Sequence, residues 1–225
     1  MIPIRDVNPR TRVPVVNISL IILNVLFFFW ELAQGPRLEA ALMNVAFIPE
    51  RIFMPGNWIQ DSVSVVLSMF LHGGWIHLGS NMLYLWIFGD NIEDRLGHVR
   101  YLLFYLACGF VATFAHAFSS PGSVLPAIGA SGAIAGVLGA YLVLFPQAHV
   151  MTAIPFGFYL AVRAVPAILV LGLWFVIQLF TGFASFGGTE QGGVAYFAHI
   201  GGFVAGLILV FVFGGKSRPI PEPRF

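Results

Sequence analysis

Residues 127–141 read Ala-Ile-Gly-Ala-Ser-Gly-Ala-Ile-Ala-Gly-Val-Leu-Gly-Ala-Tyr, with a single hydroxyl, that of Ser131, among small side chains. An uncharged, Pro- and Gly-rich loop precedes this stretch, and an apolar helix is expected to follow it. Ser131 is therefore expected in the first turn of a helix, where backbone N–H groups lack intrahelical acceptors and the helix dipole favours negative charge. This placement suits a nucleophile that generates an oxyanion beside itself.

The same small residues also suit a purely structural role. Gly, Ala and Ser at four-residue spacing let membrane helices approach each other closely, and Ser131, Ala135 and Gly139 follow that spacing, as do Gly132 and Gly136. Taken alone, this stretch favours packing. The choice between packing and chemistry therefore depends on the other segments of the chain.

The composition is that of a protein that crosses a bilayer several times. Of the 225 residues, 58% are hydrophobic and 9% are charged, whereas about a quarter of the residues in soluble domains are charged. The one cysteine, Cys108, lies in an apolar run, so neither a disulfide framework nor a thiolate metal site is expected. A net charge of +1 gives no reason to expect a nucleic acid as partner. We predict an all-α polytopic membrane protein.

Six apolar windows are long enough for membrane helices, because a bilayer core about 30 Å thick needs roughly 20 helical residues. A further apolar stretch, 62–71, is too short to span and is predicted to be an interfacial or re-entrant part of a long first loop, 34–74. The sequence thus divides into an N-terminal segment 1–13, a membrane domain 14–214 and a tail 215–225. The six windows are 14–33, 75–91, 99–118, 129–146, 163–182 and 195–214.

The basic residues predict the orientation of these helices. Lys and Arg accumulate on the cytoplasmic side of membrane proteins. With the N-terminus inside, nine of the eleven basic residues fall in inside segments, and only Arg37 and Arg51 fall in outside loops. We therefore expect both termini in the cytoplasm, which requires an even number of helices.

Three polar side chains on three different helices are expected at the same depth. Counting about 1.5 Å per residue from the cytoplasmic end of each helix puts Ser131, His77 and His199 roughly 20–25 Å above that boundary. Asn81 lies one turn from His77 on the same helix face. Ionisable groups inside a membrane are expensive and are candidates for function.

The residue types in this group suit hydrolysis of a peptide bond. Gly202 and Gly206 share a helix face with His199, so this helix can approach the helix of Ser131 closely enough for a hydrogen bond between the two side chains. Ser131 would be the nucleophile and His199 the general base. The outer half of the helices carries no Asp or Glu, so a Ser-His dyad is expected.

A tetrahedral oxyanion needs hydrogen-bond donors near the nucleophile. The candidates are the backbone N–H of Ser131, the side-chain amide of Asn81 and a ring N–H of His77.

Four motifs then follow one another in the chain. They are His-Gly-Gly-Trp-Ile-His-Leu-Gly-Ser-Asn at 72–81, Gly-Asp-Asn-Ile-Glu-Asp-Arg-Leu-Gly at 89–97, Gly-Ala-Ser-Gly at 129–132 and Ala-His-Ile-Gly-Gly at 198–202. Together they resemble the rhomboid intramembrane serine proteases, over nearly the whole chain. The resemblance implies the minimal six-helix bundle, the roles just given for the nucleophile, base and oxyanion donors, and no metal or cofactor.

The resemblance also implies roles around the centre. Glu93 looks like the family's structural element at the cytoplasmic end of the second helix, and His72 matches a histidine that is structural or organises water. Gly129 and Gly202 are expected to support the site. The implied substrates are other transmembrane proteins, cut within or beside their membrane span. The compactness of the chain favours a prokaryotic plasma membrane, and the predicted orientation has the site opening to the extracytoplasmic side.

Two departures from the family pattern concern the loop and the base. Val63 and Ser64 stand where many relatives carry a Trp-Arg pair, so the docking of the first loop must differ. Ala135 stands where some relatives carry an aromatic that packs on the catalytic histidine, so other neighbours must orient His199. The Gly-rich loop 183–194 is expected either to be a mobile cap over the dyad or to be an ordinary connector.

Other functional classes fit the sequence less well. A rhomboid-like scaffold that binds transmembrane helices without cutting them would generally lack the serine or the histidine, and both are present. A transporter or channel predicts inverted repeats or an intramembrane charge pair, and neither is evident. A zinc protease would carry a His-Glu-x-x-His motif, which is absent from the sequence.

Overall fold

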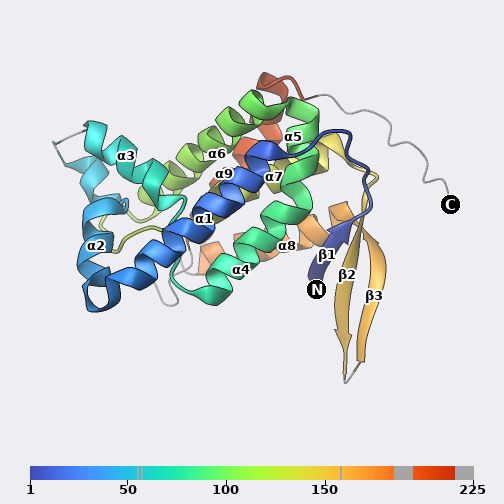
Figure 1. Ribbon diagram of the computed structural model, residues 1–225, viewed down its shortest axis with the longest axis horizontal. Helices are drawn as coiled ribbons and strands as arrows, with labels where there is room; N and C mark the ends of the chain where they lie inside the picture. The colour runs from blue at the N-terminus through green and yellow to red at the C-terminus, as the bar shows by residue number, and fades with distance from the viewer. Residues whose placement is uncertain (55, 57, 158, 185–194, 216–225) are drawn as a thin grey trace.

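The computed structural model describes residues 1–54, 56, 58–157, 159–184 and 195–215. Helices dominate it, and Figure 1 shows them running alongside one another, with the short helices of the first loop at one end and the strands at the other. The helices that correspond to the expected windows are α1 (Val15–Gln34), α4 (Trp75–Tyr84) with α5 (Asp90–Leu96), α6 (His98–Ser119), α7 (Ser131–Leu144), α8 (Ala167–Ala184) and α9 (Tyr196–Val212).

The apolar helices make this a membrane protein. Among the described residues, α1, α6 and α8 are long and apolar enough to cross a bilayer, and α7 and α9 are shorter apolar helices. A π-helical turn, η3 (Leu85–Gly89), joins α4 to α5. The first loop is largely helical, with α2 (Leu38–Val45), α3 (Trp58–Ser68) and the 3₁₀ turns η1 (Gly35–Arg37) and η2 (Pro49–Phe53). The stretch 62–71 forms the end of α3 and the turn after it.

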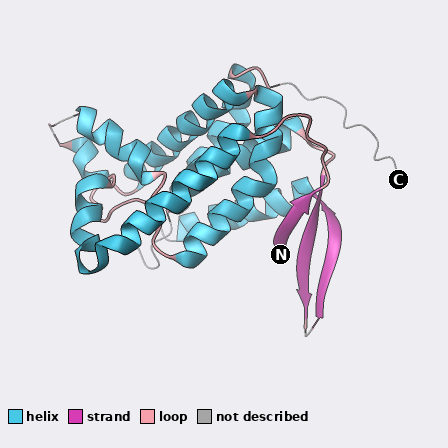
Figure 2. Cartoon of the chain, viewed as in Figure 1, coloured by secondary structure: helices cyan, strands magenta, loops and turns pink. Residues whose placement is uncertain are grey.

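The expectation of an all-α protein is wrong, because three strands form a sheet in the order β1-β2-β3. Strands β1 (Ile2–Asp6), β2 (His149–Phe156) and β3 (Tyr159–Pro166) pair antiparallel, and Figure 2 shows them at one end of the helical bundle. The N-terminal segment 1–13 therefore contributes a strand, and the helix expected from residue 163 begins at Ala167. A short apolar run does not distinguish a strand from a helix by hydropathy alone.

Helix α7 lies at the centre of the bundle and is buried almost throughout. It packs most extensively against α9, and glycines make that contact possible. A Cβ built on Gly202 would overlap the carbonyl oxygen of Gly132, and one built on Gly206 would overlap the carbonyl oxygen of Gly136. The two backbones are therefore in direct contact, as the spacing of small residues predicts.

A buried carboxylate fixes the start of α1. The two oxygens of Glu93 accept hydrogen bonds from the backbone N–H groups of Val16 and Asn17, at 2.9 and 2.7 Å. These are first-turn donors, and the negative charge also favours the positive end of the helix dipole. Glu93 is only 1% exposed. Its structural role, expected from the resemblance, thus has a direct physical basis in the capping of α1.

The side chain of Asn17 ties α1 to two further helical elements. Its amide donates to the carbonyl of Leu85 in the π-turn at 2.9 Å, and its carbonyl accepts from the hydroxyl of Tyr101 at 2.7 Å. Gly89 leaves room for this network, because a Cβ there would overlap the Asn17 side chain. Each polar group of Asn17 thus has a partner, which a polar residue inside a membrane protein requires.

A second polar cluster joins the sheet to the far end of α7. The carboxylate of Asp6 accepts hydrogen bonds from the hydroxyl of Tyr141 at 2.8 Å and from the amide of Asn91 at 2.7 Å. Burial raises the pKa of Asp6 to about 6, because desolvation disfavours the charged form more than these hydrogen bonds favour it.

The contact between α7 and α9 predicts a strong effect of one methyl group. Gly206→Ala is expected to lower the free energy of unfolding by about 1–3 kcal/mol, because the added carbon must push two backbones apart. The thermal unfolding midpoint in detergent measures this loss. Gly172→Ala on α8 is the matched control, since nothing lies within 4 Å of a Cβ at that position. Equal midpoints for the two variants would contradict the close contact.

The raised pKa of Asp6 predicts a pH-dependent effect of its neutral isostere. The folded-state pKa of about 6 lies above the usual 3.8, so this group makes the protein more stable as pH falls from 7 to 4. Asp6→Asn is expected to be more stable than the wild type at pH 8 by about 1–2 kcal/mol, with no difference near pH 4. Unfolding at the two pH values measures this, with the exposed Glu39→Gln as control. A gain that persists at pH 4 would argue against titration of Asp6.

Candidate active site

Ser131 and His199 are in direct contact at the junction of α7 and α9. The Oγ of Ser131 lies 2.8 Å from the Nε2 of His199. Ser131 is the first residue of α7, as expected. The contact follows from the glycine packing, because Gly132, next to Ser131, and Gly202, one turn after His199, bring the two backbones together.

Helix α8 supplies the neighbours that orient His199. The Oε1 of Gln178 lies 2.7 Å from the Nδ1 of His199, and an amide oxygen can only accept a hydrogen bond, so Nδ1 carries the proton. Nε2 is then the unprotonated nitrogen that faces Ser131. The ring of Trp174, one turn before Gln178, lies 5.7 Å from the imidazole between centroids, at 37°.

These two neighbours were not identified from the sequence. Gln178 is buried in an otherwise apolar helix, and a lone amide at that depth is a signal that could have found it. Trp174 lies four residues before it, on the same face. Ala135 on α7 leaves no aromatic there to pack on His199. Trp174 on α8 provides that aromatic instead.

His77 is oriented as a hydrogen-bond donor toward the site. Its Nδ1 accepts from the backbone N–H of Gly73 at 3.3 Å, so in the neutral ring the proton is on Nε2. The loop before Ser131 passes directly beneath this nitrogen at Gly129, which has a φ of 129°. A Cβ on Gly129 would lie 2.8 Å from Nε2 of His77, so the position needs glycine for both its conformation and its space.

Asn81 presents a second donor. It is 7% exposed, and among the described residues its Nδ2 has no hydrogen-bond partner. A buried donor without an acceptor costs free energy, which is the arrangement expected of a group held ready for a developing negative charge. Asn81, His77, Ser131 and His199 all line one cavity of about 450 Å³ between α4, α7, α8 and α9.

His72 lies behind His77 and contacts no group of the dyad in the described structure. Its ring meets that of His77 edge-on at 5.0 Å, and its backbone N–H donates to the carboxylate of Glu31 at 3.0 and 3.1 Å. Burial lowers the pKa of His72 to about 4, so the ring is neutral at physiological pH. This position suits a structural role, as the resemblance implies.

The first loop holds the segment that leads to Ser131. The hydroxyl of Ser68 accepts from the backbone N–H of Phe47 at 2.6 Å, and the carbonyl of Ser68 accepts from the N–H of Gly129 at 2.8 Å. Phe47 in turn accepts from the N–H of Ala127 at 2.8 Å. The loop thus docks through backbone hydrogen bonds on the residues before Ser131, without the Trp-Arg pair.

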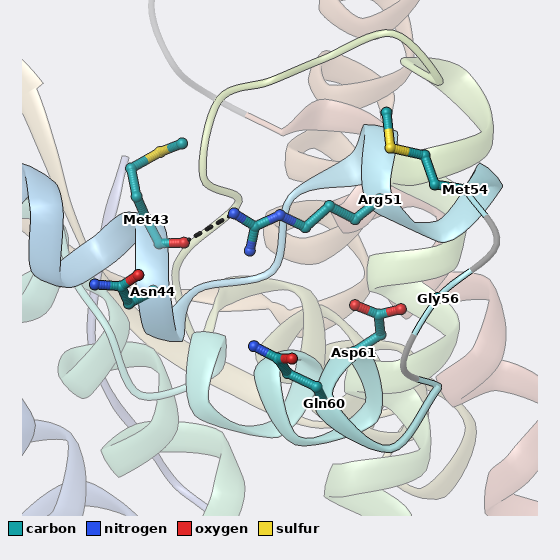
Figure 3. A pocket seen from close by; sticks show the side chains of 7 residues that line it. All are labelled: Met43, Asn44, Arg51, Met54, Gly56, Gln60 and Asp61. Carbon is teal, nitrogen blue, oxygen red and sulfur yellow. Dashed lines mark hydrogen bonds between the residues drawn. The ribbon is translucent and has the colours of Figure 1, made fainter.

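A second pocket of about 310 Å³ lies within the first loop. Figure 3 shows the guanidinium of Arg51 extending across it to the carbonyl of Met43, at 3.1 Å, with Asp61 on the opposite wall. It contains neither the serine nor a histidine of the dyad cavity. In the part of the chain that the structure describes, no three His, Cys, Asp or Glu residues are grouped as metal ligands. Of the expected cap 183–194, residues 185–194 lie outside the described residues.

Comparison with known proteins agrees with these motifs. The sequence model of the Rhomboid domain matches residues 60–216. The chain is 28% identical over 196 residues to Rhomboid protein 1, mitochondrial, of Saccharomyces cerevisiae, covering 84% of this chain and 51% of the yeast protein. It is 36% identical over 118 residues to Rhomboid protease GluP of Bacillus subtilis, covering 52% of this chain and 22% of that protein.

A plant relative gives a similar result, with 32% identity over 197 residues to RHOMBOID-like protein 6, mitochondrial, of Arabidopsis thaliana, covering 83% of this chain and 55% of that protein. The chain therefore spans about half the length, or less, of these relatives. The domain match covers well over half of the chain and includes α4 to α9, with every residue of the dyad cavity. The chain belongs to the rhomboid family.

Proposed function

We propose that this protein is an intramembrane serine endopeptidase that cuts other transmembrane proteins within or beside their membrane span. The observation that carries the proposal is the 2.8 Å contact between the Oγ of Ser131 and the Nε2 of His199. A serine hydroxyl is a weak nucleophile unless an adjacent base accepts its proton. The relative GluP is named a rhomboid protease, which agrees with this chemistry.

The first step transfers a proton from Ser131 to His199. As Oγ attacks the carbonyl carbon of the substrate, its proton moves to Nε2, which is free because Nδ1 is bonded to Gln178. His199 then gives that proton to the leaving amine, and an acyl-enzyme remains on Ser131. A water molecule, deprotonated by His199 in the same way, releases the acyl group and restores the hydroxyl.

The tetrahedral intermediate carries a negative oxygen that needs donors. The Nε2–H of His77, the amide of Asn81 and the backbone N–H of Ser131 come from α4 and the start of α7, on the two sides of the cavity. Donors fixed in place before the reaction do not have to reorganise as charge develops. Losing one of them typically costs about 10²–10³ in kcat.

The topology in this proposal has six spans with both termini in the cytoplasm and the dyad toward the other side. The nine-to-two distribution of basic residues supports it. The substrate would reach the cavity from the membrane. The prokaryotic plasma membrane expected from the sequence receives no support from the relatives, because those of yeast and Arabidopsis are named mitochondrial.

A fluorophosphonate probe tests the activated serine directly. The detergent-purified wild type is expected to label covalently, and Ser131→Ala and His199→Ala are expected to lose the labelling, since each removes one half of the proton transfer. Cleavage of a transmembrane substrate should fall by about 10³-fold or more in either variant. Wild-type protein that is folded but does not label would overturn the protease proposal and favour a helix-binding scaffold.

Gln178 is predicted to be a positioning residue for the base. Gln178→Leu keeps the size of the side chain but removes the acceptor, so Nδ1–H loses its partner and the other tautomer becomes accessible. The expected result is a fall in kcat of about 5–100-fold with little change in KM, since the loss of one buried acceptor costs about 1–3 kcal/mol.

Two further variants separate this role from simple packing. Gln178→Glu restores an acceptor and is expected to recover activity relative to Gln178→Leu. Thr181→Val on the same helix is the control, because its hydroxyl donates to the carbonyl of Ile177 one turn before it, within the helix itself. A leucine variant with unchanged kcat, or a glutamate variant as slow as the leucine one, would contradict the positioning role.

A further inference from the structure

The β2–β3 hairpin extends beyond the helices at the end of the bundle opposite the dyad. Ser131 begins α7, and the chain that leaves the other end of α7 enters β2 at His149. A helix of this length is about 20 Å long. The hairpin turns at Gly157 and returns through β3 directly into α8. Figure 2 shows the tip of the hairpin clear of the helical bundle.

One face of the hairpin is buried at its base and exposed at its tip. Cross-strand partners share a face of a sheet, as do residues two apart. Val150, which pairs with Val165, and Thr152 are completely buried at the base of the hairpin. Farther out on the same face, Phe156 and Tyr159 pair with each other and are 76% and 81% exposed.

The tip is apolar although none of the described residues covers it. Residues 153–162 carry no charge, and Leu160 and Val162 on the other face are also exposed. An isolated two-stranded hairpin is marginally stable in water. Among the residues that the structure describes, only the pairing of Ile2 with Ala153 adds a third strand to 153–162. We therefore expect the tip to contact a partner that shields its aromatic side chains from water.

The location of the hairpin identifies that partner. Because β3 continues without a break into α8, the hairpin ends at the residue before a helix that is long and apolar enough to cross a bilayer. The face that is buried at Val150 is the face that carries Phe156 and Tyr159 at the tip, so beyond the bundle these side chains would meet the surrounding bilayer. The whole hairpin, 149–166, contains Arg163 and His149 and no acidic residue, which suits anionic headgroups.

We propose that the β2–β3 hairpin binds the bilayer surface, with Phe156 and Tyr159 at the level of the lipid headgroups and Arg163 near the phosphates. Aromatic residues concentrate at this level in membrane proteins because their rings are apolar and their edges polar. The outer edge of β3 has no strand partner among the described residues. Unpaired backbone groups need water, so the hairpin lies at the interface and not in the hydrocarbon core.

Site-specific labelling measures the depth of the hairpin in the membrane. The one native cysteine, Cys108, is completely buried, so an environment-sensitive fluorophore can be attached to Tyr159→Cys in vesicles of phosphatidylcholine and phosphatidylglycerol. The emission is expected to shift to the blue, and nitroxide lipids labelled near the headgroup should quench it more strongly than lipids labelled at mid-chain.

Three reference sites make the result decisive. Phe180→Cys, on the exposed face of α8, reports contact with lipid chains, and Arg12→Cys, exposed in the N-terminal segment, reports water. Val162→Cys, on the opposite hairpin face, is expected to be quenched less than Tyr159→Cys. Emission at position 159 that matches the Arg12 site would overturn the proposal.

A blue shift without quenching by lipid would also overturn it, because it would mean that a second protein copy covers the tip. A substrate segment that pairs with the free edge of β3 would leave the tip in water until substrate is added. The measurement needs no enzymatic activity, so it stands or falls separately from the proposed protease function.

Discussion

The direct backbone contact between α7 and α9 is the constraint on which the rest of the structure depends. Carbonyl groups of Gly132 and Gly136 occupy the space that side chains at Gly202 and Gly206 would fill. In lipid, apolar side chains gain little by packing on each other instead of on acyl chains, so close contact of small residues is a main source of helix association. The close approach of the two helices also sets the distance between Ser131 and His199. The same glycines therefore determine both the helix packing and the geometry of the candidate site.

Around this contact, buried polar side chains replace the hydrophobic core of a soluble protein in fixing the arrangement. Glu93 caps α1, Asn17 joins it to the π-turn, and Asp6 fastens the sheet to α7. Each bond is made between elements far apart in sequence. Unpartnered polar groups are costly at low dielectric, so few alternative arrangements of these helices satisfy all of them. The polar residues specify the bundle, while the apolar surface places it in the membrane.

The helices and the contact between Ser131 and His199 could be predicted from the sequence, but the sheet could not. For Gln178 the sequence shows a lone amide in an apolar helix, but not that His199 is its partner. Long apolar windows and glycine spacing are local patterns that survive in a single sequence, and the motifs around Ser131 and His199 carry the family resemblance. Strand β1 pairs with residues almost 150 positions away, and no local pattern in 1–13 indicates a partner. Gln178 contacts His199 because α8 is rotated so that this side chain faces α9. That rotation depends on tertiary packing.

Gln178 and Trp174 lie on a helix whose other side faces outward. Ile177 and Phe180 of α8 are 51% and 75% exposed, and in a membrane protein that surface meets acyl chains. A force that tilts or rotates α8 by a fraction of a helical turn would separate the amide of Gln178 from the imidazole. Bilayer thickness and lateral pressure therefore bear on the alignment of His199, and for the proposed protease the surrounding lipid would be a variable of its rate.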